Sequence, residues 1–92
     1  MKELSKGRVI VDFWAPWCGP CKMQKPQMEK FKESQNEVEV VLVNVDEDSD
    51  VAQKYGVRNI PTILYLEDGV EKQRSIGITD VKKLTEMSRI SE

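Results

Sequence analysis

Six residues near the start of the chain, Val9 to Trp14, restrict its fold more than any other segment. Apolar side chains fall on both sides of this run, which is typical of a strand buried between two layers of helices. A turn at 15–17 follows, and Pro20 suits the first turn of a helix that we expect to reach Ser34. The apolar anchors expected on that helix are Met23, Met28 and Phe31. This order of strand, turn and helix indicates an α/β fold.

The rest of the chain continues the alternation of strands and helices. A strand from Val38 to Asp46 is followed by a short helix, Ser49 to Tyr55, which Gly56 can end. Strands Thr62 to Leu66 and Val70 to Ile76 are joined through Asp68-Gly69, a strong hairpin signal. Thr79 or Asp80 caps a last helix that runs toward Ile90. The predicted order is β-α-β-α-β-β-α, with the first two strands parallel.

Length and charge exclude several classes of protein. With 92 residues, the chain is expected to form a single domain, 1–92. Its 14 basic and 16 acidic residues are mixed along the sequence, so no basic stripe is present to bind nucleic acid. The first residues lack the apolar stretch of a signal peptide, and no segment suits a membrane span. We therefore expect a cytoplasmic protein with no nucleic-acid or membrane partner.

The two cysteines, Cys18 and Cys21, are the residues whose chemistry most needs an explanation. The spacing alone is ambiguous, because zinc sites, redox sites and chance all produce it. Structural zinc needs four ligands, and a chain with two cysteines and no histidine does not supply them. A permanent disulfide across so short a loop would restrain the unfolded chain little and would not persist in a reducing compartment. Redox chemistry is thus the favoured interpretation.

The position of the cysteine pair supports that interpretation. The pair lies between a buried strand and a helix, so Cys18 meets unpaired N–H groups and the positive end of the helix dipole. Both favour a thiolate at Cys18, which we expect to be exposed and to attack disulfides. Cys21 lies one helical turn later on the same side and is placed to resolve the mixed disulfide that forms.

The segment Trp17-Cys18-Gly19-Pro20-Cys21-Lys22, which follows Val11-Asp12-Phe13-Trp14-Ala15, resembles the active site of thioredoxins. The resemblance continues at Pro26, at Ile60-Pro61-Thr62 and at Ile76-Gly77, and it covers the chain from Arg8 onward. It implies a thioredoxin-like fold and a protein-disulfide reductase with a redox-active disulfide, Cys18–Cys21, and no bound cofactor or metal. It also implies two kinds of partner, which are client proteins that carry disulfides and an NADPH-dependent thioredoxin reductase that supplies electrons.

The resemblance assigns a client-binding surface. Ile60-Pro61 is similar to the family's cis-proline loop, which implies a cis bond at Pro61 and a backbone at Ile60 free to pair with an extended client chain. From the residues alone, Pro61 would be an ordinary trans proline and Trp17 a core aromatic. The client-binding residues implied are Trp17, Gly19, Pro20, Ile60, Pro61, Ile76 and Gly77.

Asp12 is the most informative polar residue, because its strand neighbours Ile10 and Trp14 on the same face are apolar. We expect its carboxyl group to be buried. One interpretation is a carboxylate tolerated beside a wet gap. The other follows from the resemblance, in which Asp12 matches the family's buried acid. Its pKa is then raised, and it takes and returns the proton of Cys21.

The chain departs from the family pattern at its start. Only seven residues precede Arg8, where thioredoxins usually have a first strand and a full helix. We therefore expect a four-stranded mixed sheet with helices on both faces, and at most a helix remnant in Met1 to Lys6. The strand from Val38 to Asp46 then becomes an edge with an apolar centre, of the kind that natural proteins usually protect. The expected state is a monomer or a weak homodimer.

A second departure lies on the same strand. Leu42 matches the position where many thioredoxins carry a lysine near the buried acid. No charge partner for Asp12 is evident from the sequence. We therefore expect its carboxyl group to stay neutral over a wider pH range.

Two other classes of function remain open at this point. In one, the fold is a non-catalytic binding module whose thiols are incidental. In the other, two chains hold a zinc ion between their cysteine pairs. Loss of activity on replacing the cysteines excludes the first, and elemental analysis tests the second.

Overall fold

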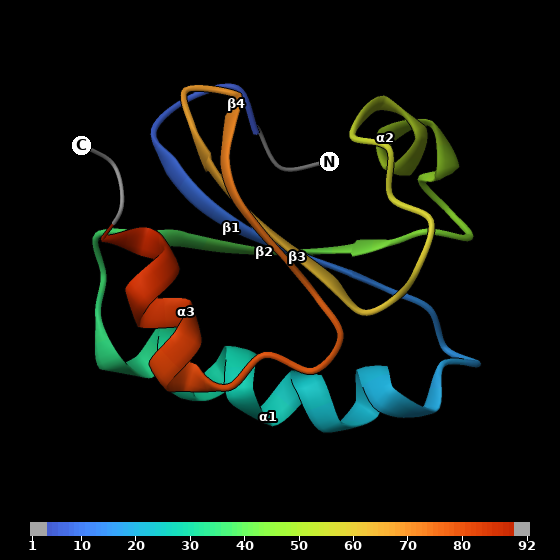
Figure 1. The fold of residues 1–92 in the computed structure, drawn as a ribbon, viewed down its shortest axis with the longest axis horizontal. Coiled ribbons are helices and arrows are strands. Elements are labelled where there is room, and N and C mark those ends of the chain that lie inside the picture. Colours follow the sequence, from blue (N-terminus) through green and yellow to red (C-terminus); the bar gives the residue numbers. More distant parts are fainter. Residues whose placement is uncertain (1–3, 90–92) are drawn as a thin grey trace.

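Four strands form one mixed sheet in the computed structural model of this chain, which describes residues 4–89. The elements are β1 (Arg8–Trp14), α1 (Gly19–Ser34), β2 (Glu39–Asn44), α2 (Ser49–Lys54), β3 (Thr62–Glu67), β4 (Val70–Ile76) and α3 (Val81–Ser88). The strand order is β2-β1-β3-β4, in which β1 is parallel to β2 and the other two pairs are antiparallel. Helices α1 and α3 cover one face and α2 covers the other (Figure 1). The predicted fold class is confirmed.

Strand β1 lies inside the sheet and is apolar on both faces. Val9, Val11 and Phe13 pack with α2 on one face. Ile10 packs on the opposite face against side chains of α1 and α3, which are Met28, Phe31, Leu84 and Met87. Burying each such side chain stabilises the fold by roughly 1.5 to 3 kcal/mol. Asp12 also points toward the α1 face and is the one ionisable side chain that β1 buries.

The predicted end of β2 is wrong and the predicted cap of α3 is confirmed, and a side-chain hydrogen bond gives the reason for each. Strand β2 ends at Asn44 instead of Asp46, because the Asn44 side chain accepts the backbone N–H of Asp46 at 2.9 Å and forms a turn. Helix α3 is capped by Asp80, whose carboxylate accepts the N–H of Lys83 at 3.0 Å. The predicted end near Ile90 lies outside the described residues.

The start of the chain agrees with the expectation of at most a helix remnant where it is described. Residues 4–6 form no helix, and Leu4 is buried in the layer beneath α2. The remaining part of the predicted helix remnant, 1–3, lies outside the described residues. Within 4–89, no helix is long and apolar enough to cross a bilayer. That the whole chain, 1–92, forms a single domain stays a prediction.

The buried face of α1 is rotated from its predicted position. Met23, expected as a core anchor, is 65% exposed, whereas the polar Gln24 is 0% exposed. Gln24, Met28 and Phe31 fall on one face because they are four and then three residues apart. The helix therefore places an uncharged amide in its core stripe where the sequence pattern predicted a thioether.

The hairpin between β3 and β4 is confirmed. Asp68 and Gly69 have φ angles of 51° and 84°, the left-handed conformation that a two-residue turn between twisted strands requires. The β4 strand at the end of this hairpin leads into residues 77–80, which reach α3. This connection brings Gly77 beside the loop that precedes β3, where its N–H donates to the carbonyl of Pro61 at 2.8 Å.

Arg8 ties the first strand to the last helix. Its Nε–H donates to the Tyr65 hydroxyl at 2.8 Å, and its Nη2 donates to the carbonyl of Ser88 at 2.7 Å. The Tyr65 hydroxyl in turn donates to Glu67 at 2.7 Å. These charge-assisted bonds satisfy the buried end of Tyr65 and the carbonyl at the end of α3. The pattern of apolar residues gave no signal for this network.

Candidate active site

The cysteine pair lies at the junction between strand β1 and helix α1. Strand β1 ends at Trp14, and a tight turn is closed by a hydrogen bond from the Cys18 N–H to the carbonyl of Ala15 at 3.1 Å. Cys18 then occupies the N-cap of α1, and its Sγ accepts the backbone N–H of Cys21 at 3.2 Å. The sulfur thus fills the position that a Ser or Asp oxygen usually takes. Negative charge on this sulfur is stabilised by the N–H group and by the helix dipole.

Cys18 and Cys21 are joined as a disulfide, with their Cα atoms 5.3 Å apart. Both residues are only 4% exposed, so the expectation of an exposed Cys18 beside a shielded Cys21 is wrong for this oxidised form. Cys18 is covered because the half-buried Ile60 packs against the pair. The carbonyl oxygen of Ile60 lies 3.8 Å from the Cys18 Sγ. The two sulfurs differ in surroundings, since Cys21 and not Cys18 lines the pocket described next.

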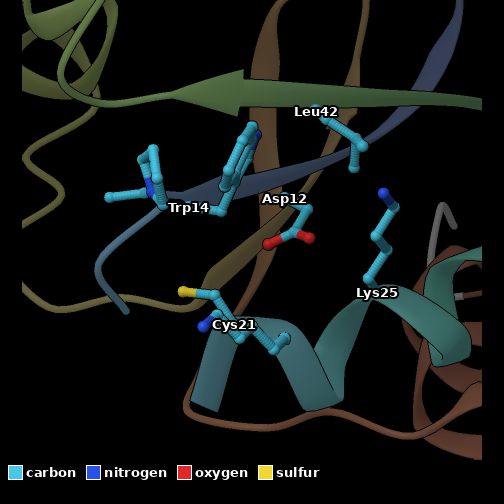
Figure 2. Close-up of a pocket in the computed structure, with 8 residues that line it drawn as sticks. Asp12, Trp14, Cys21, Lys25 and Leu42 are labelled. Carbon is cyan, nitrogen blue, oxygen red and sulfur yellow. The ribbon is translucent and has the colours of Figure 1, made fainter. Parts of the chain in front are cut away.

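A pocket of about 210 Å³ opens beside Cys21. Its lining consists of Asp12, Trp14, Ala15, Pro16, Cys21, Lys22, Lys25 and Leu42. The Asp12 carboxylate points into this space between β1 and α1, with Cys21 and Lys25 on the helix below it (Figure 2). Asp12 and Cys21 therefore come together as predicted.

The Asp12 carboxyl group is buried without a bonding partner for one of its oxygens. Its Oδ1 has no hydrogen-bond partner among the described residues. Burial raises the pKa of Asp12 from 3.8 to about 7, because an apolar surrounding disfavours the charged form. At neutral pH the carboxyl group is therefore present in both protonation states, which suits a group that accepts and returns protons.

The sequence analysis missed the cations at this pocket. Leu42 pairs in register with Asp12 and leaves the position of the family's lysine apolar, as predicted. Lys25 and Lys22 nevertheless line the same pocket from α1. Lys25 follows Cys21 by four residues, a spacing that places both on one side of a helix and that could have indicated its position. Burial is nevertheless the only cause of the raised pKa of Asp12, which agrees with the expectation that its carboxyl group stays neutral over a wider pH range.

Four of the predicted client-binding residues lie on two segments that approach the disulfide through Ile60. The Ile60–Pro61 peptide bond is cis. Gly77, with a φ of 99°, donates its N–H to the carbonyl of Pro61 and so joins the two loops. Ile76, next to Gly77, is exposed although it is large and apolar. Ile60, Pro61, Ile76 and Gly77 thus form one continuous edge beside Cys18.

Trp17 and the two residues between the cysteines complete the surroundings. Trp17 is exposed, so the interpretation as a core aromatic is wrong, and its indole Nε1–H donates to Asp46 at 3.0 Å. Asp46 is a further residue that the sequence analysis missed. Gly19 and Pro20 form the first turn of α1, and a Cβ added at Gly19 would meet no atom within 4 Å. The space beside Gly19 is therefore open.

Metal ligation has no support in the part of the chain that the structure describes. Within 4–89, no three His, Cys, Asp or Glu side chains are grouped so that they could hold a metal ion. A reversible disulfide at a helix N-terminus, with a buried carboxyl group of raised pKa beside its second cysteine, instead defines a thiol–disulfide oxidoreductase.

Comparisons with known proteins give the family. The thioredoxin family model matches residues 1–89. Thioredoxin from Bacillus subtilis is 45% identical over 86 residues, covering 92% of this chain and 83% of that protein. Thioredoxin from Mycoplasma genitalium is 43% identical over 83 residues, covering 90% of this chain and 81% of that protein.

Solved structures agree with this family assignment. The thioredoxin of Nicotiana alata superposes with a TM-score of 0.85 at 38% identity, over 95% of this chain and 76% of that one. The Fasciola hepatica thioredoxin superposes with a TM-score of 0.84 at 36% identity, over 95% of this chain and 85% of that one. The chain belongs to the thioredoxin family, whose redox group is the disulfide itself.

The raised pKa of Asp12 predicts a pH-dependent stability. Because the folded-state pKa of about 7 exceeds the unfolded value of 3.8, the native state holds the proton more tightly. This contribution to stability is complete below the unfolded pKa and is lost as pH rises through the folded pKa. Asp12→Asn should therefore raise the free energy of unfolding at pH 8 by roughly 1 to 3 kcal/mol.

Denaturant melts between pH 4 and pH 8 measure this effect. The gain from Asp12→Asn should shrink as pH falls, whereas Asp50→Asn, at an exposed site on α2, should stay within about 0.5 kcal/mol of the wild type. A destabilised Asp12→Asn at pH 8 would mean that the carboxylate makes structural interactions that outweigh its burial.

Proposed function

We propose that this oxidoreductase acts as a reductase of client proteins, with Cys18 as nucleophile and Cys21 as resolving thiol. The observation that carries the proposal is the pair of different surroundings of the two sulfurs. Cys18 Sγ caps α1 and accepts the Cys21 N–H at 3.2 Å, whereas Cys21 lines the pocket of Asp12. The first arrangement suits a stable thiolate, and the second suits a thiol that must lose its proton at a defined moment.

In the first exchange, the Cys18 thiolate attacks one sulfur of the client disulfide. A bond forms between Cys18 Sγ and that sulfur, the client S–S bond breaks, and the other client sulfur leaves as a thiolate that takes a proton from solvent. The N–H of Cys21 stabilises the attacking charge before the bond forms.

In the second exchange, Asp12 acts as the proton shuttle. Its carboxylate accepts the proton of the Cys21 thiol, and the Cys21 thiolate attacks Cys18 Sγ. The mixed disulfide breaks, the second client sulfur leaves and takes up a proton, and Cys18–Cys21 is oxidised. Two electrons have then passed to the client. A carboxyl pKa of about 7 is suited to this transfer near neutral pH.

The edge beside Cys18 holds an extended segment of the client. Trp17 and Ile76 offer exposed apolar side chains to it, and the backbone of Ile60 lies close to the disulfide. Gly19 and Pro20 form the first turn of α1, and Gly19 adds no side chain that a client would have to pass. Main-chain pairing of this kind recognises extended chains with little dependence on sequence.

Electrons come from an NADPH-dependent thioredoxin reductase, in the cytoplasm, where a dithiol can be kept reduced. Gly19 and Pro20 place no charge between the cysteines, which supports reduction over oxidation as the direction of exchange. The disulfide is the only redox group that this mechanism requires.

Single cysteine substitutions test the two roles. Reduced wild-type protein should reduce insulin, and Cys18→Ser should abolish this activity because no nucleophile remains. Cys21→Ser should instead trap clients as mixed disulfides, since the first exchange still occurs and the second cannot. Immobilised Cys21→Ser incubated with insulin and analysed by mass spectrometry should release the client only with reductant. Activity that survives both substitutions would favour the binding-module alternative.

Asp12→Asn tests the proton shuttle. The second exchange should slow by about tenfold or more at pH 7, because the acceptor for the Cys21 proton is lost. In the wild type this rate should rise as pH passes through about 7, where Asp12 ionises, and the variant should lack that rise. Stopped-flow measurement of mixed-disulfide decay separates this step from the first exchange. The exposed Asp50→Asn is the control, and an unchanged pH profile in Asp12→Asn would remove Asp12 from the mechanism.

The edge strand β2 supports weak self-association of this chain. Within 4–89, β2 pairs with β1 alone, and Leu42 at its centre is 45% exposed. Acidic residues at both ends of the strand, Glu37, Asp46 and Glu47, repel a second copy and keep the association weak.

Light scattering over a concentration series tests this proposal. The mean mass should rise toward millimolar concentration, and more so at high salt because screening weakens the repulsion. Leu42→Gln should suppress the rise. Val70→Gln, at an exposed apolar residue on the other edge strand, should not. A constant monomer mass under all conditions would contradict the proposal.

A further inference from the structure

Gln24 is a fully buried amide that the mechanism above does not use. It lies on α1 three residues after Cys21 and is 0% exposed. Its Nε2 donates to the carbonyl of Thr79 at 2.7 Å, and its Oε1 accepts the N–H of Thr79 at 2.6 Å. Nε2 also contacts the sulfur of Met28 at 3.2 Å. One side chain therefore satisfies both backbone groups of a single loop residue, as a neighbouring strand would.

Thr79 is hydrogen-bonded in turn to the client-binding edge. Its hydroxyl donates to the carbonyl of Gly77 at 3.0 Å, so the hydroxyl of Ser75, 2.7 Å away, acts as donor to Thr79. The N–H of Gly77 then donates to the carbonyl of Pro61 at 2.8 Å. A continuous chain of hydrogen bonds thus runs from α1, which carries the cysteines, through residues 77–79 to the loop before β3.

Beyond the pairing of Ile76 with Thr62 at the end of β4, little other support holds residues 77 and 78 in place. Ile76 and Ile78 on either side of Gly77 are both exposed, and Gly77 itself has a φ of 99° and no side chain. Apolar packing therefore does not fix the loop. The buried amide of Gln24 and the hydrogen bonds of Thr79 fix it instead.

We propose that Gln24 is a positioning residue that holds the client-binding loop at residues 76–79 in register with the disulfide. This inference rests on the proposed function, because the loop has a role only if it contacts the client. Binding a client in a reactive position requires its contacts to be held within a fraction of an ångström. A buried, two-point amide contact supplies that restraint from the same helix that carries Cys21.

Gln27 provides a matched control on the same helix. Its Oε1 accepts the N–H of Val81 at 3.0 Å, so it also joins α1 to the segment after β4. Val81 is the first residue of α3 and lies beyond the loop. Replacing Gln27 thus removes a similar helix-to-backbone hydrogen bond without releasing residues 76–79.

The test compares Gln24→Met with Gln27→Met, since methionine keeps the length of the side chain and removes the amide. Reduced protein is mixed rapidly with insulin at increasing concentrations, and separately with a small disulfide, hydroxyethyl disulfide, that is too short to reach the loop. For Gln24→Met, the half-saturating insulin concentration should rise about three- to tenfold, with the limiting rate and the small-disulfide rate unchanged within about twofold. Gln27→Met should match the wild type in all three quantities.

Amide hydrogen exchange gives an independent readout that does not depend on activity. The Gly77 N–H should exchange faster in Gln24→Met than in the wild type and should be unchanged in Gln27→Met. If Gln24→Met does not fold, Gln24→Asn takes its place, because its amide is one methylene too short to reach both groups of Thr79.

The possible results distinguish a failure of the proposed reductase function from a failure of the positioning role of Gln24. A wild type that does not reduce insulin contradicts the proposed function, and the exchange rate at Gly77 then still decides whether Gln24 holds the loop. An active wild type whose Gln24 variant keeps the same half-saturating concentration contradicts the positioning role alone. Equal effects in Gln24→Met and Gln27→Met would mean that Gln24 only stabilises the fold in general, and they would overturn the proposal.

Discussion

The junction between β1 and α1 determines most of what this molecule can do. The strand delivers the chain to the helix start through a tight turn, and the sulfur of Cys18 fills the capping position that the first free N–H groups of the helix require. Helix geometry then places Cys21 one turn away, within reach of a disulfide. A single structural requirement, the capping of α1, thus coincides with the electrostatic requirement for a stable thiolate.

Asp12 illustrates the opposite relation between stability and chemistry. A carboxyl group in the middle of a buried strand weakens the fold at neutral pH, since part of its unfolded-state ionisation is lost on folding. The same burial brings its pKa into the range where proton exchange with a thiol is effective. The pocket beside this group, lined in part by Lys22 and Lys25, is the space in which the carboxyl lies next to Cys21.

Element types and their order followed from periodicity, because the apolar pattern of each segment agrees with its final environment. The rotation of α1 about its own axis did not follow from periodicity. Met23 and Gln24 are adjacent, and the apolar pattern favours burial of Met23. Gln24 is buried instead, because the backbone groups of Thr79 need hydrogen-bond partners. That need arises from a loop more than fifty residues away in sequence, which local pattern does not report.

Part of the site was predictable in the same way, and part of it was not. The cysteines, Asp12 and the loops at Pro61 and Gly77 could be assigned because a short motif and a resemblance place them. The burial of Cys18 and the approach of Lys25 to the pocket depend on how distant segments pack, in particular on Ile60 covering the sulfur. Long side chains such as lysine add a further difficulty, since their reach leaves several placements open until the fold fixes one.

The bond between Arg8 and the carbonyl of Ser88 joins residues that are 80 positions apart. During synthesis on a ribosome, β1 emerges first and can bond to Tyr65 of β3, but the carbonyl of Ser88 joins it only after α3 has been made. The strand that carries Asp12 and leads to the cysteines therefore reaches its final environment only after α3 has been made. Until then the part of the sheet that Leu84 and Met87 of α3 cover stays exposed, so the core behind the active-site strand is completed only when that helix packs.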